Sequence, residues 1–121
     1  MRDSVTIVLM LIFLSCGDIL APGKDLPGPY YLGERDDGTW TLYYELDDAG
    51  IGRVNLVEKA GWTGKYLLAE GEKGYYIIDK EKDGPFLNSE DIALGPFSES
   101  AFRNLLDSLN ISNFQFQIDL R

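Results

Sequence analysis

Two apolar runs near the middle of the chain give its clearest hydrophobic pattern. Residues 66–70 (YLLAE) and 75–79 (YYIID) are rich in Tyr, Leu and Ile, and the segment 71–74 (GEKG) between them has glycine at both ends. Such a pair predicts a β-hairpin. Neither run alternates cleanly between apolar and polar positions, which is typical of strands covered on both faces. We therefore expect this hairpin in the middle of an antiparallel sheet.

Further strands are predicted before the hairpin. Residues 39–46 alternate between apolar and polar positions, which indicates a half-buried strand with Tyr43 on its more polar face. Residues 30–34 and 53–59 are shorter apolar runs and are also predicted strands. Trp62 lies between two glycines, so we expect it at a bend, either covering the core or exposed as a contact residue, with the first favoured.

Two acidic, glycine-containing segments separate these strands. Asp36 and Asp37 precede a glycine, and Asp-Gly is typical of tight hairpin turns. A calcium loop would also need alternating acidic positions and a distal Glu, which this segment lacks. Residues 47–52, which begin with Asp47 and Asp48, are predicted to form an acidic, glycine-rich loop.

The C-terminal third predicts one amphipathic helix and one last strand. Ser98 is a suitable N-cap, and it precedes apolar residues at the i, i+3, i+4, i+7 spacing of a helix face. A single helical turn is expected near residues 89–92. Residues 114–119 alternate strictly, which predicts a last strand with Phe114, Phe116 and Ile118 inward. The apolar stripe of the helix consists of Phe102, Leu105, Leu106 and Leu109.

These elements predict an α+β fold. We expect an antiparallel β-meander of about five to six strands, with one C-terminal amphipathic helix packed on the sheet. At 121 residues the chain is long enough for one hydrophobic core and too short for two. Residues 30–121 are therefore predicted to form a single domain.

The N-terminal residues have the features of an export signal. Residues 5–14 are apolar, and this length matches the core of a signal peptide and is about half of what a bilayer-spanning helix needs. Cys16 follows one small residue later, which resembles a bacterial lipoprotein signal, where the thiol is acylated and the chain is cut before it. We therefore predict a signal peptide over 1–15, lipidation at Cys16 and a flexible tether over 16–29. Plain secretion, an uncleaved signal anchor and a buried segment are the alternatives.

The charge balance narrows the class of partner. Twenty Asp and Glu face eleven Lys and Arg, for a net charge of −9. This field repels phosphate backbones and anionic headgroups, so nucleic acid is disfavoured. It would attract a basic protein, and simple solubility is the alternative explanation of the charge. The chain has one Cys and no His, so no cofactor or metal site is expected and the common zinc, haem and catalytic-triad chemistries lose their usual residue.

The chain also resembles a small family of uncharacterised bacterial lipoproteins of about this size. The features in common are the Cys16 signal, the segment 62–69, the strand 75–79, the Gly-Pro-Phe sequence 95–97 and the helix that follows it. The chain departs from that pattern by extra residues between the strand and the Gly-Pro-Phe sequence. The resemblance implies a location in the cell envelope and a compact domain, and it brings no known activity.

Together these features predict a lipid-anchored module outside the cytoplasm, held at the outer membrane or the outer face of the plasma membrane. We expect it to bind or inhibit a protein partner that carries basic residues. A structural envelope lipoprotein without a discrete ligand is the alternative, and a hydrolase that uses two carboxylates is the least favoured. The candidate contact residues are Tyr43, Asp36, Asp37, Asp47 and Asp48.

Overall fold

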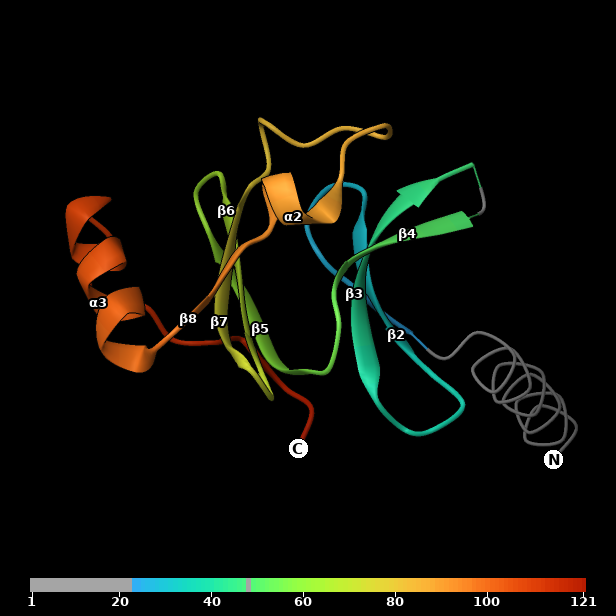
Figure 1. The fold of residues 1–121 in the computed structure, drawn as a ribbon, viewed down its shortest axis with the longest axis horizontal. Helices are drawn as coiled ribbons and strands as arrows, with labels where there is room; N and C mark the ends of the chain where they lie inside the picture. The colour runs from blue at the N-terminus through green and yellow to red at the C-terminus, as the bar shows by residue number, and fades with distance from the viewer. Residues whose placement is uncertain (1–22, 48) are drawn as a thin grey trace, which may run out of the picture.

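The computed structural model describes residues 23–47 and 49–121, which form two antiparallel sheets and two helices (Figure 1). The first sheet has the order β1-β2-β3-β4, and the second has the order β8-β7-β6-β5-β9. The first consists of β1 (Gly23–Asp25), β2 (Tyr30–Glu34), β3 (Trp40–Leu46) and β4 (Ala49–Val54). The second consists of β5 (Val57–Thr63), β6 (Tyr66–Gly71), β7 (Gly74–Asp79), β8 (Leu94–Phe97) and β9 (Ile118–Asp119). The helices are α2 (Ser89–Ile92) and α3 (Glu99–Ser108).

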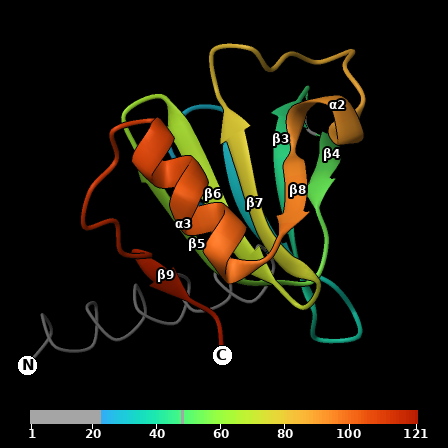
Figure 2. The same cartoon turned by 60° about the vertical axis from the view of Figure 1, so that its left-hand side comes forward.

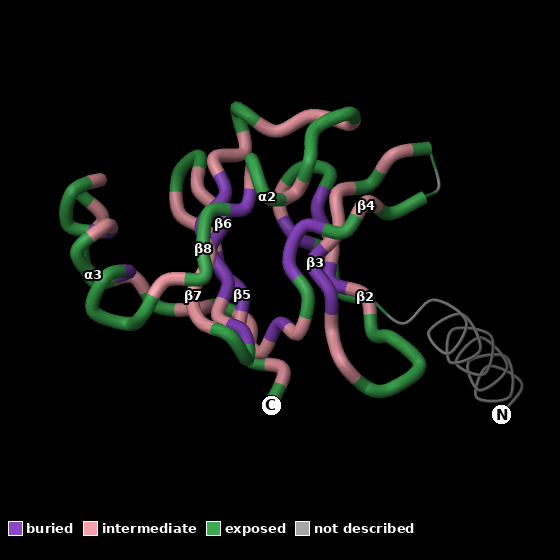
Figure 3. The backbone as a smooth tube through the Cα atoms, viewed as in Figure 1, coloured by how far each residue is buried: buried purple, intermediate pink, exposed green. Residues whose placement is uncertain are grey.

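The elements form three layers. The two sheets face each other, and α3 lies on the far side of the second sheet (Figures 1 and 2). Buried residues occur in the strands of both sheets (Figure 3), and most of them form one core between the sheets. Both sheets contribute to this core, so burial of apolar surface holds them together. Its buried members are Leu26, Tyr30, Leu32, Leu42, Val54, Val57, Ala60, Leu67, Ala69, Ile78 and Ala93.

The central strand β6 is buried on both faces. Leu67 and Ala69 belong to the core between the sheets, whereas Leu68 belongs to a second cluster with Phe102 and Leu106 of α3. Because successive side chains of a strand point to opposite faces, coverage on both sides requires a continuous apolar run. The predicted hairpin, its position inside a sheet and its coverage on both faces are therefore confirmed.

The predicted helix and fold class are also confirmed. The Ser98 hydroxyl accepts a hydrogen bond from the Ala101 backbone N–H at 3.2 Å, which caps the first turn of α3. Asn110 ends the helix in the left-handed region with φ of 60°. The short helical turn is present as α2. The chain is an α+β fold built on antiparallel, meander-like strands.

The strands between residues 47 and 63 differ from the prediction. As a result, the strands form two sheets instead of the single predicted sheet. Residues 49–52, a predicted loop, belong to β4, and Trp62 lies within β5 instead of at a bend, half-buried against the core. The predicted strand 53–59 is interrupted, because residues 53–54 end β4 in one sheet and residues 57–59 begin β5 in the other. Leu56 has a φ of 57°, which interrupts any strand, and its carbonyl accepts the Glu72 backbone N–H at 3.1 Å.

The folded part also begins earlier than predicted. The tether predicted over residues 16–29 extends too far, because Gly23–Asp25 form β1 and Leu26 is buried in the core. Pairing of β1 with β2 satisfies backbone groups that a tether would leave to water. The predicted signal peptide over 1–15 and Cys16 lie outside the described residues.

The C-terminal strand is shorter than the alternation of 114–119 predicts. Only Ile118 and Asp119 pair with β5, as β9. Phe114 and Phe116 pack at the second cluster, and the Phe114 ring occupies the space that a side chain at Gly61 of β5 would need. The strand β8 was missed, since its Gly-Pro sequence is typical of a turn. In residues 23–47 and 49–121, no helix is long and apolar enough to cross a bilayer.

Candidate functional site

Two stacked tyrosines lie on the outer face of the first sheet. Tyr31 of β2 and Tyr43 of β3 are directly opposite each other in the register, and their rings stack with centroids 5.2 Å apart at 21°. In β2, the residues on either side of Tyr31, which are Tyr30 and Leu32, point to the core. Because side chains alternate along a strand, Tyr31 points away from the core. Both tyrosines are half-buried, so each remains partly accessible to solvent.

Glycines beside the rings create the space for this stack. A Cβ atom at Gly50 would approach the Tyr43 ring to 2.9 Å and would collide with the Tyr31 hydroxyl. A Cβ atom at Gly33 would also come within 2.9 Å of the Tyr43 ring. The two rings therefore lie over backbone that carries no side chain. We call the surface formed by Tyr31, Tyr43, Gly33 and Gly50 the tyrosine face.

Carboxylates surround the tyrosine face. Asp25 pairs with Tyr31 in the register and shares its face, and Glu45 follows Tyr43 on the same side of β3. Residues 23–54 contain seven acidic and three basic side chains, and Arg53 is buried in an ion pair. The six acidic residues of this segment that the structure describes are all exposed. The first sheet therefore presents a strongly negative surface.

The predicted contact residues all belong to this sheet or its turns, but the two acidic pairs lie apart. Asp36 and Asp37 occupy the β2–β3 turn, and Asp47 begins the β3–β4 turn at the opposite end of the sheet (Figure 1). Asp48 lies outside the described residues. Asp37 accepts hydrogen bonds from the Thr39 hydroxyl and backbone N–H, which lowers the pKa of its carboxyl. The prediction of turn chemistry for this pair is confirmed.

Three residues of this surface were missed from the sequence: Tyr31, Asp25 and Glu45. Only the pairing of β1, β2 and β3 brings these three residues beside Tyr43. Matching the side-chain alternation of residues 30–34 with that of residues 39–46 would have indicated part of this arrangement. Partial burial is the main cause that raises the pKa of Tyr31, and Tyr43 and Glu45 raise it further. The hydroxyl of Tyr31 therefore stays neutral and able to donate at physiological pH.

A buried ion pair fixes a long connection to the first sheet. We call residues 80–88 between β7 and α2 the strap, which spans the two sheets in Figure 1. The Arg53 guanidinium donates to both carboxylate oxygens of Asp83, with Nε–Oδ2 at 3.0 Å and Nη2–Oδ1 at 2.7 Å. The Tyr30 hydroxyl donates to the same carboxylate at 2.7 Å. Both ionic side chains are completely buried, so this group holds the fold and offers no access to a ligand.

Tyr30 should make stability fall at alkaline pH. Burial first, and the hydrogen bond to Asp83 second, raise the pKa of Tyr30 above its ordinary value of 10.0. Above pH 10 the unfolded chain therefore releases a proton that the folded chain keeps, so the free energy of unfolding should decrease by about 1.4 kcal/mol per pH unit from this group. Below pH 10 the contribution is constant.

Denaturant titrations across alkaline pH test this expectation. Tyr30→Phe should show a shallower decrease than the unsubstituted chain. Equal slopes for Tyr30→Phe and the unsubstituted chain would contradict the role assigned to Tyr30.

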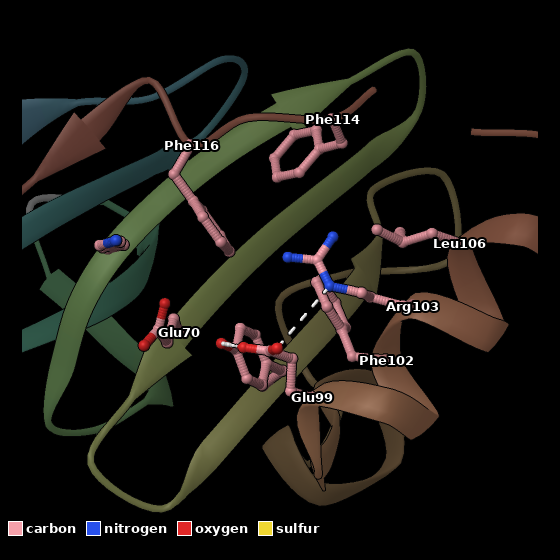
Figure 4. A pocket seen from close by; sticks show the side chains of 9 residues that line it. Glu70, Glu99, Phe102, Arg103, Leu106, Phe114 and Phe116 are labelled. Atoms are coloured by element: carbon pink, nitrogen blue, oxygen red, sulfur yellow. Dashed lines mark hydrogen bonds and ion pairs between the residues drawn. The ribbon is translucent and has the colours of Figure 1, made fainter. Parts of the chain in front are cut away.

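A separate groove lies between α3, the C-terminal segment and the second sheet (Figure 4). It has a volume of about 290 Å³, and Glu70 and Glu99 line it together with three phenylalanines. Tyr75 donates to Glu99 at 3.1 Å, and Arg103 lies 3.9 Å from the same carboxylate. The Glu99 side chain is 64% exposed. It therefore lies in the environment of an ordinary surface carboxylate, unlike the desolvated acid that carboxylate hydrolases use.

In the described part of the chain, no group of three or more Asp, Glu, His or Cys residues is placed to hold a metal ion. Comparison with protein-family models, with curated proteins and with solved structures found no match. The resemblance to bacterial lipoproteins therefore stays a prediction.

Proposed function

We propose that this chain is a lipid-anchored module of the cell envelope that binds a basic protein partner through the tyrosine face. One observation carries the proposal: Tyr31 and Tyr43 stack on an outer sheet face that neither helix of the described residues covers (Figures 1 and 2). A contiguous, partly exposed aromatic surface is typical of binding sites.

The surroundings of the rings favour a cationic group, and arginine in particular. A guanidinium can lie over a tyrosine ring and at the same time donate to a neighbouring carboxylate such as Glu45 or Asp25. A cation over an aromatic face contributes about 0.5–1 kcal/mol when exposed and about 2 kcal/mol when desolvated. The acidic turns on either end of the sheet would mainly accelerate encounter with a basic partner.

Binding to an arginine-rich peptide should depend on both tyrosines. Replacing Tyr31 and Tyr43 together with Ser removes the stacking surface, so affinity should fall about tenfold or more, while Phe at both positions should keep most of it. A lysine-rich peptide of equal length should bind more weakly than the arginine-rich one, because ammonium groups stack poorly. Fluorescence anisotropy measures each affinity, and raised salt should weaken both complexes.

A matched pair of charge variants provides the control. Glu45→Gln next to the tyrosine face should weaken binding, whereas Glu72→Gln in the β6–β7 turn should leave it unchanged, although both remove one exposed charge. If the two variants weaken binding equally, the interaction reflects net charge and the proposal fails. If neither peptide binds, a structural envelope lipoprotein without a discrete ligand becomes the better description.

A further inference from the structure

The strand β4 forms an open edge of the first sheet. In residues 23–47 and 49–121, no strand pairs with its outer side, and no backbone hydrogen bond from another segment reaches residues 49–52. Because alternate residues of a strand direct their N–H and C=O groups to opposite sides, β4 presents a row of unpaired backbone donors and acceptors. Such a row is complementary to the main chain of another extended segment.

The other sheet edges are blocked or short. The edge strand β1 carries the exposed charges of Lys24 and Asp25, β8 contains Pro96, and β9 pairs over two residues only. Charged side chains, proline and short length are the usual features that keep an edge from pairing. Residues 49–52 (AGIG) of β4 have no charge and no proline, and the one charged residue of this strand, Arg53, is buried.

The tyrosine face extends to this open edge. Gly50 and Gly52 pair with Glu45 and Tyr43 in the register, so both glycines lie on the outer face of the sheet. The Tyr31 side chain starts two strands away in β2, and its hydroxyl lies against Gly50. A strand added to β4 would run about 5 Å from β4, which is one strand spacing. Its side chains would therefore lie next to the tyrosine rings.

Gly52 is a glycine that the described residues do not require. Its φ is outside the left-handed region, and a Cβ atom there would meet only the Thr41 Cγ2 atom at an ordinary 3.8 Å. Glycine within a strand lowers stability relative to alanine, and it often marks a place where another backbone or a ligand approaches closely. With Gly50, it leaves the outer face of β4 without a side chain between the open edge and Tyr43. A long side chain from an added strand would fit into this gap.

We propose that an arginine-containing segment of the basic partner binds as an extended strand along β4. This inference deepens the function proposed for the tyrosine face and rests on it. Main-chain hydrogen bonds with β4 provide affinity, and side chains at alternate positions face the outer surface. From such a position an arginine can cross the two glycines, stack on Tyr43 and donate to Glu45. The exposed carboxylate of Asp47, next to β4, favours the same basic segment.

Backbone methylation of a peptide tests the pairing. The probe is an octapeptide that alternates arginine and valine, made without N-methyl groups, with them on the arginines, or with them on the valines. All three peptides keep the same side chains and charges, and only one alternate set of N–H groups can face β4. By fluorescence anisotropy with the chain carrying Cys16→Ser, we expect one methylated peptide to bind about tenfold or more weakly and the other within about twofold. Equal affinities for all three, or equal losses for both methylated peptides, would overturn the pairing.

Substitutions at Gly52 provide the matching change in the chain. Ala and then Val at this position should weaken binding of the unmethylated peptide stepwise, by about tenfold or more for Val, while the thermal unfolding temperature does not decrease. Gly84→Ala is the control, because a Cβ atom there also has room, with the Leu87 Cδ1 atom at 3.7 Å. This control should bind as the unsubstituted chain does. Unchanged affinity for both Gly52 variants would contradict the proposal.

The Tyr31→Ser, Tyr43→Ser double variant separates this proposal from the function on which it rests. Binding that is lost in the double variant but does not depend on methylation would keep the tyrosine face and overturn the edge pairing. Methylation-dependent binding that the double variant retains would overturn the function of the tyrosine face instead, and no binding of any peptide would overturn both. Sedimentation of the chain alone should show a monomer. A dimer that Gly52→Val dissociates would assign the edge to a second copy and overturn the proposal.

Discussion

Replacing Asp83 with Ala should lower the free energy of unfolding by about 3–5 kcal/mol. The substitution leaves the Arg53 guanidinium completely buried without its carboxylate, and it also removes the acceptor of the Tyr30 hydroxyl. Two carbonyls of the strap would remain as partners for Arg53, and they carry no charge to balance it. A loss of this size is a large part of the total stability of a small domain, which is about 5–15 kcal/mol.

Urea titrations of the purified domain measure the effect, with Glu58→Ala as the control. Glu58 pairs with Arg121 at 3.6 Å at the surface, where such a pair contributes at most about 1 kcal/mol. The double variant Arg53→Met, Asp83→Leu should be more stable than Asp83→Ala alone, since it leaves no unpaired charge. A cost below about 1 kcal/mol for Asp83→Ala would mean that the strap is held by other contacts.

Replacing Cys16 with Ser should abolish stable membrane association. Each buried methylene of an acyl chain contributes roughly 0.8 kcal/mol, and stable anchoring takes more than one chain. The bacterial lipoprotein signal, which residues 5–16 resemble, supplies several chains at one cysteine, so the change should be all or none. In the part of the chain that the structure describes, no helix could replace the anchor by crossing the bilayer.

Fractionation of cells grown with labelled palmitate tests this prediction. The unsubstituted chain should carry label and sediment with membranes, Cys16→Ser should do neither, and Ser15→Ala should behave as the unsubstituted chain. Membrane association without label in the unsubstituted chain would instead favour an uncleaved signal anchor. Release of an unlabelled chain into the soluble fraction would favour plain secretion.

The elements predicted correctly are those with local signals. The hairpin of β6 and β7, the alternation of β3, and α3 with its Ser98 cap each follow from residues close together in the chain. The division into two sheets does not, because it depends on Leu56, a non-glycine residue in the left-handed region. A leucine gives no sequence signal for that conformation, so the strand was extended through it.

The strand β4 shows a second limit of local patterns. Gly50 and Gly52 are typical of a loop, and nothing between residues 47 and 54 indicates that they pair with β3. Position 50 requires a glycine because the rings of Tyr31 and Tyr43 occupy the space that a side chain there would need. That requirement comes from two other strands, so it becomes visible only when the register is known.

The candidate site was predictable in part for the same reason. Tyr43 and the acidic turns were found from alternation and composition, whereas Tyr31 needed the pairing of β2 with β3. The partners Arg53 and Asp83 lie 30 residues apart, and no spacing rule connects them.

Chemical-shift mapping tests the location of the proposed binding site directly. The isotope-labelled mature chain with Cys16→Ser is titrated with the arginine-rich peptide, and shift changes are followed at each backbone amide. Binding at the tyrosine face predicts changes concentrated in β2, β3 and β4, with Tyr31, Tyr43 and Gly50 among the largest. Changes concentrated around the groove of Glu70 and Glu99, or distributed evenly over the acidic residues of both sheets, would contradict it.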